Sequence, residues 1–414
     1  MRRLLAVCLF AAFPASAASF IGADAAQHAF AELRDMCHAD GGAMWGADLC
    51  GPTLFVDRAT RSVVADRADR DGTLKQSGAV WVGTLPATIG ISNTAVDWEG
   101  ERWTMIMWPL PSDAFARKTL LAHESFHRIQ ERAGFPSTGP ANAHLDSLDG
   151  RYLMQLEWRA LAAALSGSKR GLRDAILFRA RRRELFPSAA NEERQLEMHE
   201  GLAEYTGTAL AEPRLASRMP LLVKKLAEAE KTPSFVRSFA YTSGPAWGAL
   251  LEQYEPHWTR NIKSSDDLGE RVRKAAKIEL PPDLARTADG RANTYDGRTL
   301  LANERAREEK RQARLKDFRA RFVDGPVLVL PLRKMSMQFN PDDVQPFEPA
   351  GTVYPEITVS DEWGRIVVKS GALISSDFSR ITVPAKSDGY TLELKKGWTK
   401  AAGARAGDFV VDKR

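Results

Sequence analysis

The pentapeptide His-Glu-Ser-Phe-His that runs from His123 to His127 constrains the fold more than any other segment of this chain. It lies within residues 119–133, a stretch without Pro or Gly that Gly134 ends. Residues four apart on a helix project from the same face, so a helix here brings the two imidazoles to one point. The pattern therefore predicts a helix whose two histidines bind one Zn²⁺. Two surface histidines on an amphipathic helix are the alternative explanation.

Glu124 lies next to the predicted metal, and a carboxylate in this position indicates a catalytic site. Zinc lowers the pKa of a bound water, and a neighbouring carboxylate accepts the proton that this water gives up. We therefore expect Glu124 to act as the base of a hydrolytic centre.

A hydrolytic zinc site takes three protein ligands and keeps one position for water, so a third ligand is needed. Glu200 is the best candidate, because helical spacing puts Glu204 on the same face, where it can accept a hydrogen bond from a liganding imidazole. His199 precedes this pair and is expected on the helix surface or behind a ligand. The alternatives for the third ligand lie between the two ligand helices: Glu157, His144, Asp146 and Asp149.

The two motifs together, His-Glu-x-x-His and Glu-Gly-Leu-Ala-Glu-Tyr, resemble the gluzincin metallopeptidases, in particular the aminopeptidase-N-like branch of the MA clan. The resemblance implies that His123, His127 and Glu200 are zinc ligands. It also implies that Glu124 is the general base. A tyrosine ahead of a Gly-bearing helix hydrogen-bonds the developing oxyanion in that family, and Tyr241 fits its position.

The chain also departs from that family. His127 and Glu200 are separated by more residues than is usual there, which predicts additional helices between them. Residues 103–111 fit a substrate-flanking strand, but they lack the Glu that would recognise a free amino terminus. The sequence therefore does not predict aminopeptidase specificity.

The N-terminus predicts export. Two arginines, the apolar run 4–13 and a small-residue site near Ala17 form a secretory signal peptide, which places the mature protein in the periplasm or outside the cell. Cys37 and Cys50 remain after cleavage and are expected to form a disulfide. A metal site made of these cysteines and His38 is the alternative.

The order of patterns predicts an α+β chain. Residues 18–260 are expected to form a zincin-like catalytic domain, a small twisted sheet followed by helices. Residues 261–322 are expected to be an irregular segment and a charged connecting helix. Residues 323–414 are expected to form an antiparallel β-sandwich or barrel. The expected strands are 53–56, 62–65, 79–82, 103–108, 327–332, 356–359, 364–369, 380–384, 390–394 and 408–411. The expected helices are 20–36, 145–165, 169–186, 189–210, 215–231 and 241–254.

The sequence thus predicts an exported zinc-dependent metallopeptidase with a peptide or protein substrate. A non-catalytic periplasmic zinc-binding scaffold, or a metal-dependent esterase or amidase, are the alternatives. The net charge is +5, and the basic cluster 179–183 is expected on a solvated helix face without the aromatic residues of a nucleic-acid surface. No stretch after the signal peptide is apolar and long enough for stable membrane insertion.

Overall fold

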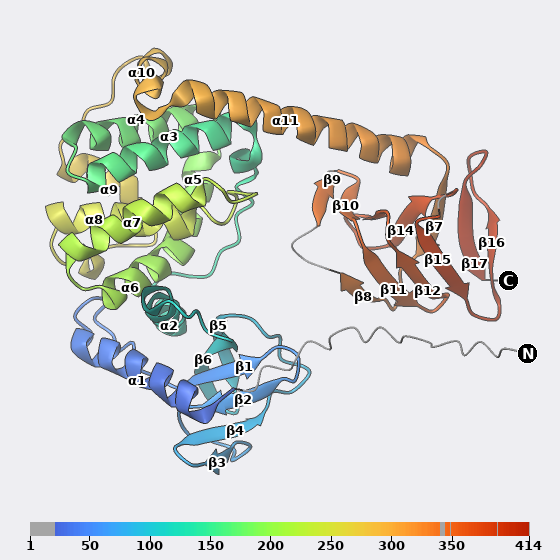
Figure 1. Ribbon diagram of the computed structural model, residues 1–414, viewed down its shortest axis with the longest axis horizontal. Coiled ribbons are helices and arrows are strands. Elements are labelled where there is room, and N and C mark those ends of the chain that lie inside the picture. The colour runs from blue at the N-terminus through green and yellow to red at the C-terminus, as the bar shows by residue number, and fades with distance from the viewer. Residues whose placement is uncertain (1–20, 340–343, 348, 387, 414) are drawn as a thin grey trace, which may run out of the picture. The chain divides into compact units, whose positions relative to one another are not determined.

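The structure is a computed structural model that describes residues 21–339, 344–347, 349–386 and 388–413. The chain forms two compact units that divide between residues 302 and 303 (Figure 1). Residues 1–17, which the sequence predicts to be a signal peptide, lie outside the described residues. Among the described residues, no helix has an apolar stretch long enough to cross a bilayer.

The first unit begins with one helix and a six-stranded sheet. Its strands follow the order β3-β4-β2-β1-β6-β5, and only β1 and β6 pair in parallel. Their bounds are β1 Thr53–Asp57, β2 Ser62–Ala65, β3 Lys75–Ser77, β4 Val80–Thr84, β5 Thr94–Trp98 and β6 Glu101–Trp108. The four predicted strands are present. β3 and β5 were not predicted, and β3 is short, polar and exposed.

Alternating side chains give this sheet two apolar faces. Leu54, Val56 and Met105 belong to a small core on one face. Phe55 and Ile106 belong to the main core, which they share with the helices. The helices therefore cover one face of the sheet, as the period-2 pattern of a half-buried strand requires.

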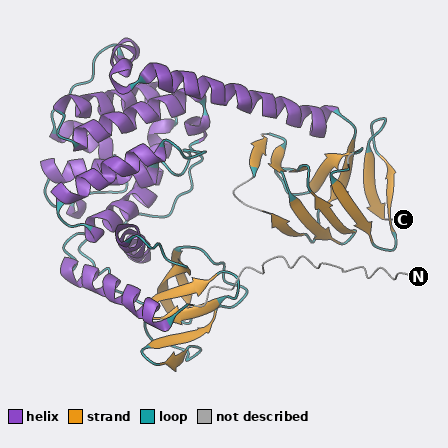
Figure 2. Cartoon of the chain, in the orientation of Figure 1, coloured by secondary structure: helices purple, strands orange, loops and turns teal. Residues whose placement is uncertain are grey.

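In sequence, α1 precedes the sheet and the other helices of the first unit follow it. Figure 2 shows the helices in purple and the strands in orange. Their bounds are α1 Ala23–Asp40, α2 Ala114–Gln130, α3 Leu148–Leu165, α4 Lys169–Leu185, α5 Ala189–Leu196, α6 Leu202–Ala211, α7 Leu215–Ala229 and α8 Ala240–Tyr254. Asp113 is the N-cap of α2, and its side chain accepts a hydrogen bond from the Ala116 N–H at 2.8 Å. The predicted helix 189–210 is not continuous: a π-helical turn, Glu197–Gly201, separates α5 from α6.

The expectation of an irregular segment after residue 260 was wrong for much of its length. α9 Leu268–Ala275 and α10 Leu284–Ala292 form there, and Leu268 and Val272 are buried in the main core. The missed signals are two helix N-caps: Asp267 and Asp283 each accept a hydrogen bond from the backbone N–H three residues later. The charged segment forms α11 Gly297–Arg319, followed by a π-helical turn, Ala320–Asp324.

Among its described residues, the second unit consists mainly of eleven strands in two sheets that share one apolar core. The sheet orders are β16-β17-β7-β14-β13-β10-β9 and β15-β12-β11-β8, with only β7 and β17 parallel. All six predicted strands are present. The bounds are β7 Val327–Pro331, β8 Ser336–Phe339, β9 Gln345–Phe347, β10 Gly351–Tyr354, β11 Ile357–Asp361, β12 Gly364–Val368, β13 Ala372–Ile374, β14 Arg380–Pro384, β15 Tyr390–Leu394, β16 Trp398–Ala402 and β17 Phe409–Lys413.

Candidate metal centre

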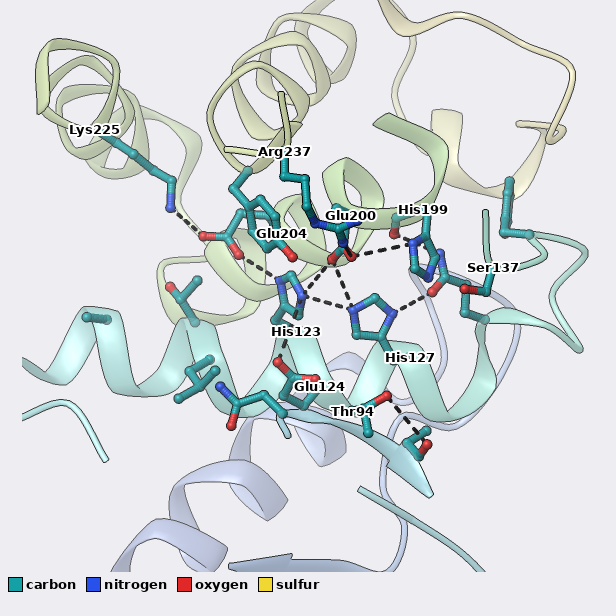
Figure 3. Close-up of a pocket in the computed structure, with 18 of the residues that line it drawn as sticks. Thr94, His123, Glu124, His127, Ser137, His199, Glu200, Glu204, Lys225 and Arg237 are labelled. Atoms are coloured by element: carbon teal, nitrogen blue, oxygen red, sulfur yellow. Dashed lines mark hydrogen bonds and ion pairs between the residues drawn. The ribbon is translucent and has the colours of Figure 1, made fainter. Parts of the chain in front are cut away.

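Three side chains from two segments meet at one point in the first unit. His123 and His127 project from successive turns of α2, and Glu200 projects from the π-helical turn that lies against it (Figure 3). The two Nε2 atoms are 3.0 Å apart. Glu200 Oε2 lies 3.6 Å from His123 Nε2 and 3.4 Å from His127 Nε2.

These three separations fit a zinc site. Tetrahedral coordination with bonds of about 2.0–2.2 Å puts ligand atoms about 3.3–3.6 Å apart, close to the separations of the two imidazoles and Glu200. Glu124 also lies near the histidines, but its Oε1 is 4.0 Å from His123 Nε2, farther than Glu200. Of the two carboxylates, Glu200 thus approaches His123 Nε2 more closely.

Hydrogen bonds on the far side of both imidazoles orient them. His123 Nδ1 lies 2.7 Å from Glu204 Oε2, and Glu204 also contacts Lys225. A carboxylate flanked by a cation only accepts hydrogen bonds, so Nδ1 carries a proton and Nε2 is the nitrogen that faces Glu200. The Lys225 charge and the hydrogen bond from His123 outweigh burial and lower the pKa of Glu204 to about 2.

Gln130 orients the imidazole of His127 in the same way as Glu204 orients that of His123. Its Nε2 donates to the backbone carbonyls of Met198 and His199, at 3.2 and 2.8 Å, so its Oε1 accepts from His127 Nδ1 at 2.6 Å. Gln130 thus ties α2 to the turn that carries Glu200. The sequence contained a signal for it, because Gln130 follows His127 by three residues on the same helix face. Lys225 had no such signal.

The polar surroundings favour a positive charge between the ligand atoms. Burial disfavours a protonated His123, but its contacts with Glu200 and Glu204 outweigh burial and raise the pKa of His123 to about 10. Burial likewise opposes ionisation of Glu200, yet both histidines and Tyr241 hold its pKa well below the usual value. The carboxylates that favour this proton, Glu200 and Glu204, also attract a divalent cation, which must displace the proton in order to bind.

Glu124 points into the same space from α2 (Figure 3). Its side chain is 5% exposed, and its Oε2 has no hydrogen-bond partner among the described residues. Burial raises the pKa of Glu124, although the two histidines counteract this. A buried carboxylate oxygen without a partner, close to a metal position, is suited to accept a proton from a small molecule bound there.

Tyr241, at the start of α8, stacks against His123. The two rings are parallel, with centroids 5.5 Å apart and an interplanar angle of 4°. The Tyr241 hydroxyl interacts with Glu200, and burial together with this carboxylate raises the pKa of Tyr241. The phenol therefore remains a hydrogen-bond donor at neutral pH.

A cavity of about 940 Å³ opens onto these side chains. Asn93, Thr94 and Ala95, at the start of β5, form part of its wall. β5 is an edge strand of the sheet, whereas β6 pairs on both sides. Because an edge strand has unpaired backbone groups, it is β5, rather than the predicted strand 103–111, that can flank an extended ligand.

The alternative ligands lie elsewhere. His144 contacts Glu193 at 3.0 Å, and Asp146 accepts hydrogen bonds from Ser234. Asp149 does not line the cavity. Glu157 is fully buried and bonds Arg179 and Arg182 at 3.2 and 2.6 Å.

We expected the basic cluster 179–183 to lie on a solvated helix face, but this expectation was wrong for part of the cluster. Arg179 and Arg182 are buried, because acidic side chains from several elements neutralise them. These partners are Glu157, Glu193, Glu197 and Asp267. Sequence periodicity within α4 alone gives no information about these partners.

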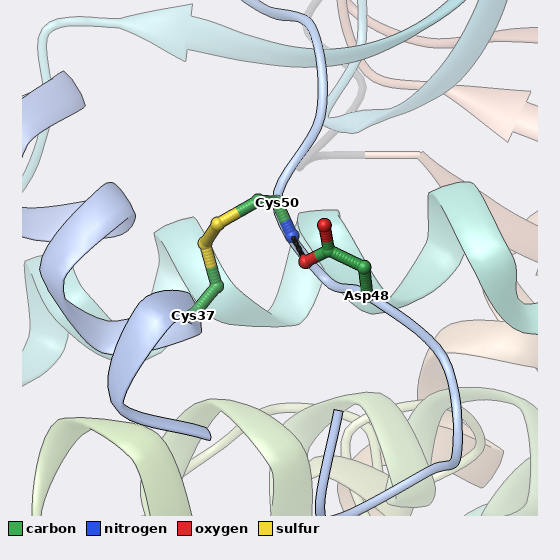
Figure 4. A group of neighbouring side chains, drawn as sticks. All are labelled: Cys37, Asp48 and Cys50. Carbon is green, nitrogen blue, oxygen red and sulfur yellow. Dashed lines mark hydrogen bonds between the residues drawn. A yellow bond between two sulfur atoms is a disulfide. The ribbon is translucent and has the colours of Figure 1, made fainter. Parts of the chain in front are cut away.

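The predicted disulfide joins Cys37 and Cys50, with Cα atoms 5.5 Å apart (Figure 4). Both sulfurs are consumed by this bond, so the alternative metal site with His38 is excluded. Arg128, next to His127 on α2, donates to the backbone carbonyls of Asp48 and Cys50 at 3.1 and 2.7 Å. The crosslinked loop is thus attached to the helix that carries the histidines.

Comparisons of this chain with family models, with curated proteins and with solved structures found no match. The functional conclusion therefore rests on the geometry of the site.

Proposed function

We propose that this protein is a zinc-dependent metallopeptidase of gluzincin type, with a zincin-like catalytic domain. The single observation that carries the proposal is the meeting of His123 Nε2, His127 Nε2 and Glu200 Oε2 at separations of 3.0–3.6 Å beside a cavity. Three protein ligands next to an accessible space are typical of catalytic rather than structural zinc sites.

Each remaining side chain has a function in peptide-bond hydrolysis. A bound zinc ion supplies Lewis acidity, which activates water and polarises a carbonyl. Glu124 accepts the proton of the attacking water through its unpartnered Oε2 and returns it to the leaving amine. Tyr241 donates a hydrogen bond to the oxygen on which negative charge develops.

The wall of the cavity supports a peptide as the substrate. An extended peptide can add to the free edge of β5 through backbone hydrogen bonds, which places its amide bonds along the cavity. We also propose export to the periplasm or outside the cell, because the Cys37–Cys50 disulfide is compatible with an oxidising compartment.

The test compares the purified mature protein with Glu124→Gln and His127→Ala. We expect about one zinc per chain in the wild type and in Glu124→Gln, and strong loss of zinc in His127→Ala. Hydrolysis of a mixed peptide library should fall by about 100-fold or more in Glu124→Gln, because the base is lost while the metal stays. His28→Ala is the control, since this side chain is 69% exposed.

Two results would replace the proposal. A wild type that binds zinc but cleaves no peptide, together with hydrolysis of model esters that depends on Glu124, would identify an esterase. Absence of both activities with zinc firmly bound would identify a scaffold protein.

A further inference from the structure

We propose that Arg237 binds a carboxylate group of the substrate next to the scissile bond, so that the centre selects peptides with a negative charge there. This inference rests on the proposed peptidase function. Arg237 precedes α8 and lines the cavity with a side chain that is 56% exposed. Its Nη2 donates to Glu200 Oε1 at 3.0 Å (Figure 3).

Most of the guanidinium remains available to a ligand. An arginine has five N–H donors in a planar fork. Within the described part of the chain, the contact with Glu200 is the one hydrogen bond that Arg237 makes. The other donors can bind a carboxylate with two parallel hydrogen bonds, a geometry that a lysine does not offer.

The other cations of the cavity already have partners. Lys225 contacts Glu204, which orients His123. Lys224 and Arg102 pair with exposed carboxylates, at 3.8 and 2.7 Å. Arg237 is paired as well, but its partner is Glu200, a proposed metal ligand, so among these cations it is the one best placed to bind an anionic ligand beside the metal position.

The Glu200 carboxylate fixes how far Arg237 lies from the reacting bond. One of its oxygens contacts Arg237, and the other faces the two imidazole Nε2 atoms. The Glu200 carboxylate thus lies between the guanidinium and the metal position and contacts both. A group bound there belongs to the residue that flanks the scissile bond.

The local charge also favours an anion. The carboxylates nearest the metal position are Glu124, Glu200 and Glu204. A divalent ion together with Lys225 and Arg237 exceeds their combined charge by one. The three carboxylates are buried, whereas Lys225 and Arg237 reach solvent with side chains that are 32% and 56% exposed, so a bound carboxylate meets the excess positive charge on the open side of the site.

The test measures binding rather than turnover. Zinc-loaded Glu124→Gln protein is titrated by calorimetry with tetraalanine, with its C-terminal amide, and with amidated tetrapeptides that carry Glu or Gln at one position. We expect a carboxylate ligand to bind about 10-fold more tightly than its neutral counterpart, as for charge-assisted hydrogen bonds. The free-acid pair detects a C-terminal carboxylate, and the Glu–Gln pairs detect a side chain.

When Arg237→Gln is combined with Glu124→Gln, the preference for the carboxylate ligand should fall to within about 2-fold. The affinity for the neutral peptides should stay the same. Lys224→Gln removes a charge from the same cavity and should keep the preference. If Arg237→Gln loses zinc, Arg237→Lys takes its place, and its preference should fall at least about 3-fold because the planar fork is lost.

Equal binding of charged and neutral peptides by the Glu124→Gln protein would overturn this inference and leave the peptidase proposal intact. An unchanged preference in the zinc-loaded Arg237 variant would also overturn it. Failure of the proposed function has a different signature, because a wild type that cleaves no peptide can still show the carboxylate preference in the binding experiment.

Discussion

Glu204 orients the imidazole of His123, and Lys225 in turn holds the Glu204 carboxylate. Glu204 Oε2 lies 2.7 Å from His123 Nδ1, and Lys225 holds the second oxygen of the carboxylate. We expect Glu204→Gln to weaken zinc binding by about 10–100-fold, because the neutral amide no longer raises the basicity of the imidazole. Competition with a chromophoric chelator measures the affinity. Glu228→Gln, an exposed carboxylate on the same cavity, is the control. An unchanged affinity in Glu204→Gln would contradict this function.

Site residues could be predicted from the sequence where they are spaced three or four apart along one helical segment. His123 and His127 are four residues apart, as are Glu200 and Glu204, and this spacing identified all four as candidates from the sequence alone. Lys225 and Arg237 give no comparable signal. Their positions depend on how α7 packs against α6 and how the residues before α8 pack against the turn that carries Glu200, and this packing is a tertiary property.

At the scale of helices, two glycines set the distance between Tyr241 and Glu200. A Cβ atom on Gly244 would lie 2.4 Å from the Cα of Gly201, so α8 and the π-helical turn are in backbone contact. This contact holds Tyr241, one turn before Gly244, beside the Glu200 carboxylate.

We expect Gly244→Ala to separate these elements and to cost about 1–3 kcal/mol of unfolding free energy, because the backbone must move. Turnover should fall more than substrate affinity, since the Tyr241 hydrogen bond forms mainly in the transition state. Chemical denaturation and steady-state kinetics measure the two effects. Gly290→Ala is the matched control: its Cβ would meet no atom within 4 Å, so this helical site should gain up to about 1 kcal/mol. Equal effects of both substitutions would refute the close-contact explanation.

The ion pairs of Asp267 attach α9 to α4. Burial alone would raise the pKa of Asp267, but Arg179 and Arg183 outweigh it and hold this pKa well below its usual value. Because the folded-state pKa is below the unfolded-state value, the stabilisation is complete above about pH 4 and is lost as the pH falls through the folded-state pKa.

Asp267→Asn should therefore lower the unfolding free energy by about 3 kcal/mol at pH 7, and the difference from the wild type should shrink below about pH 4. Urea denaturation at several pH values measures it. Asp283→Asn controls for helix capping, because Asp283 caps α10 from an exposed position and asparagine caps equally well. A pH-independent loss in Asp267→Asn would rule out the ion pairs as its cause.

The elements that the sequence predicts best have long periodic patterns, such as α3 and α4. α9 escaped prediction because its buried stripe is only Leu268 and Val272 within a charged sequence. The π-helical turn Glu197–Gly201 escaped because its residues fit a regular helix equally well. Such turns are frequent at functional sites, and here the turn carries Glu200.

At the scale of the whole molecule, the division between residues 302 and 303 falls within α11. The N-terminal part of this helix belongs to the first unit, where Leu300 is buried in the main core. Its C-terminal part belongs to the second unit, where Phe318 and Phe322 pack against Val353 and Leu373. Residues 312–314, between these parts, are exposed.

A cut between residues 312 and 313 therefore leaves both apolar cores complete. We expect fragment 18–312 to bind one zinc with an affinity within about 2-fold of the full chain, since every proposed ligand and its hydrogen-bond partners lie in the first unit. Fragment 313–414 should unfold cooperatively and show the circular dichroism of β structure. A fragment starting at 325 is the control, because it lacks Phe318 and Phe322 and should be less stable. Loss of zinc from a folded fragment 18–312 would show that the metal centre depends on the second unit and would contradict this division of the molecule.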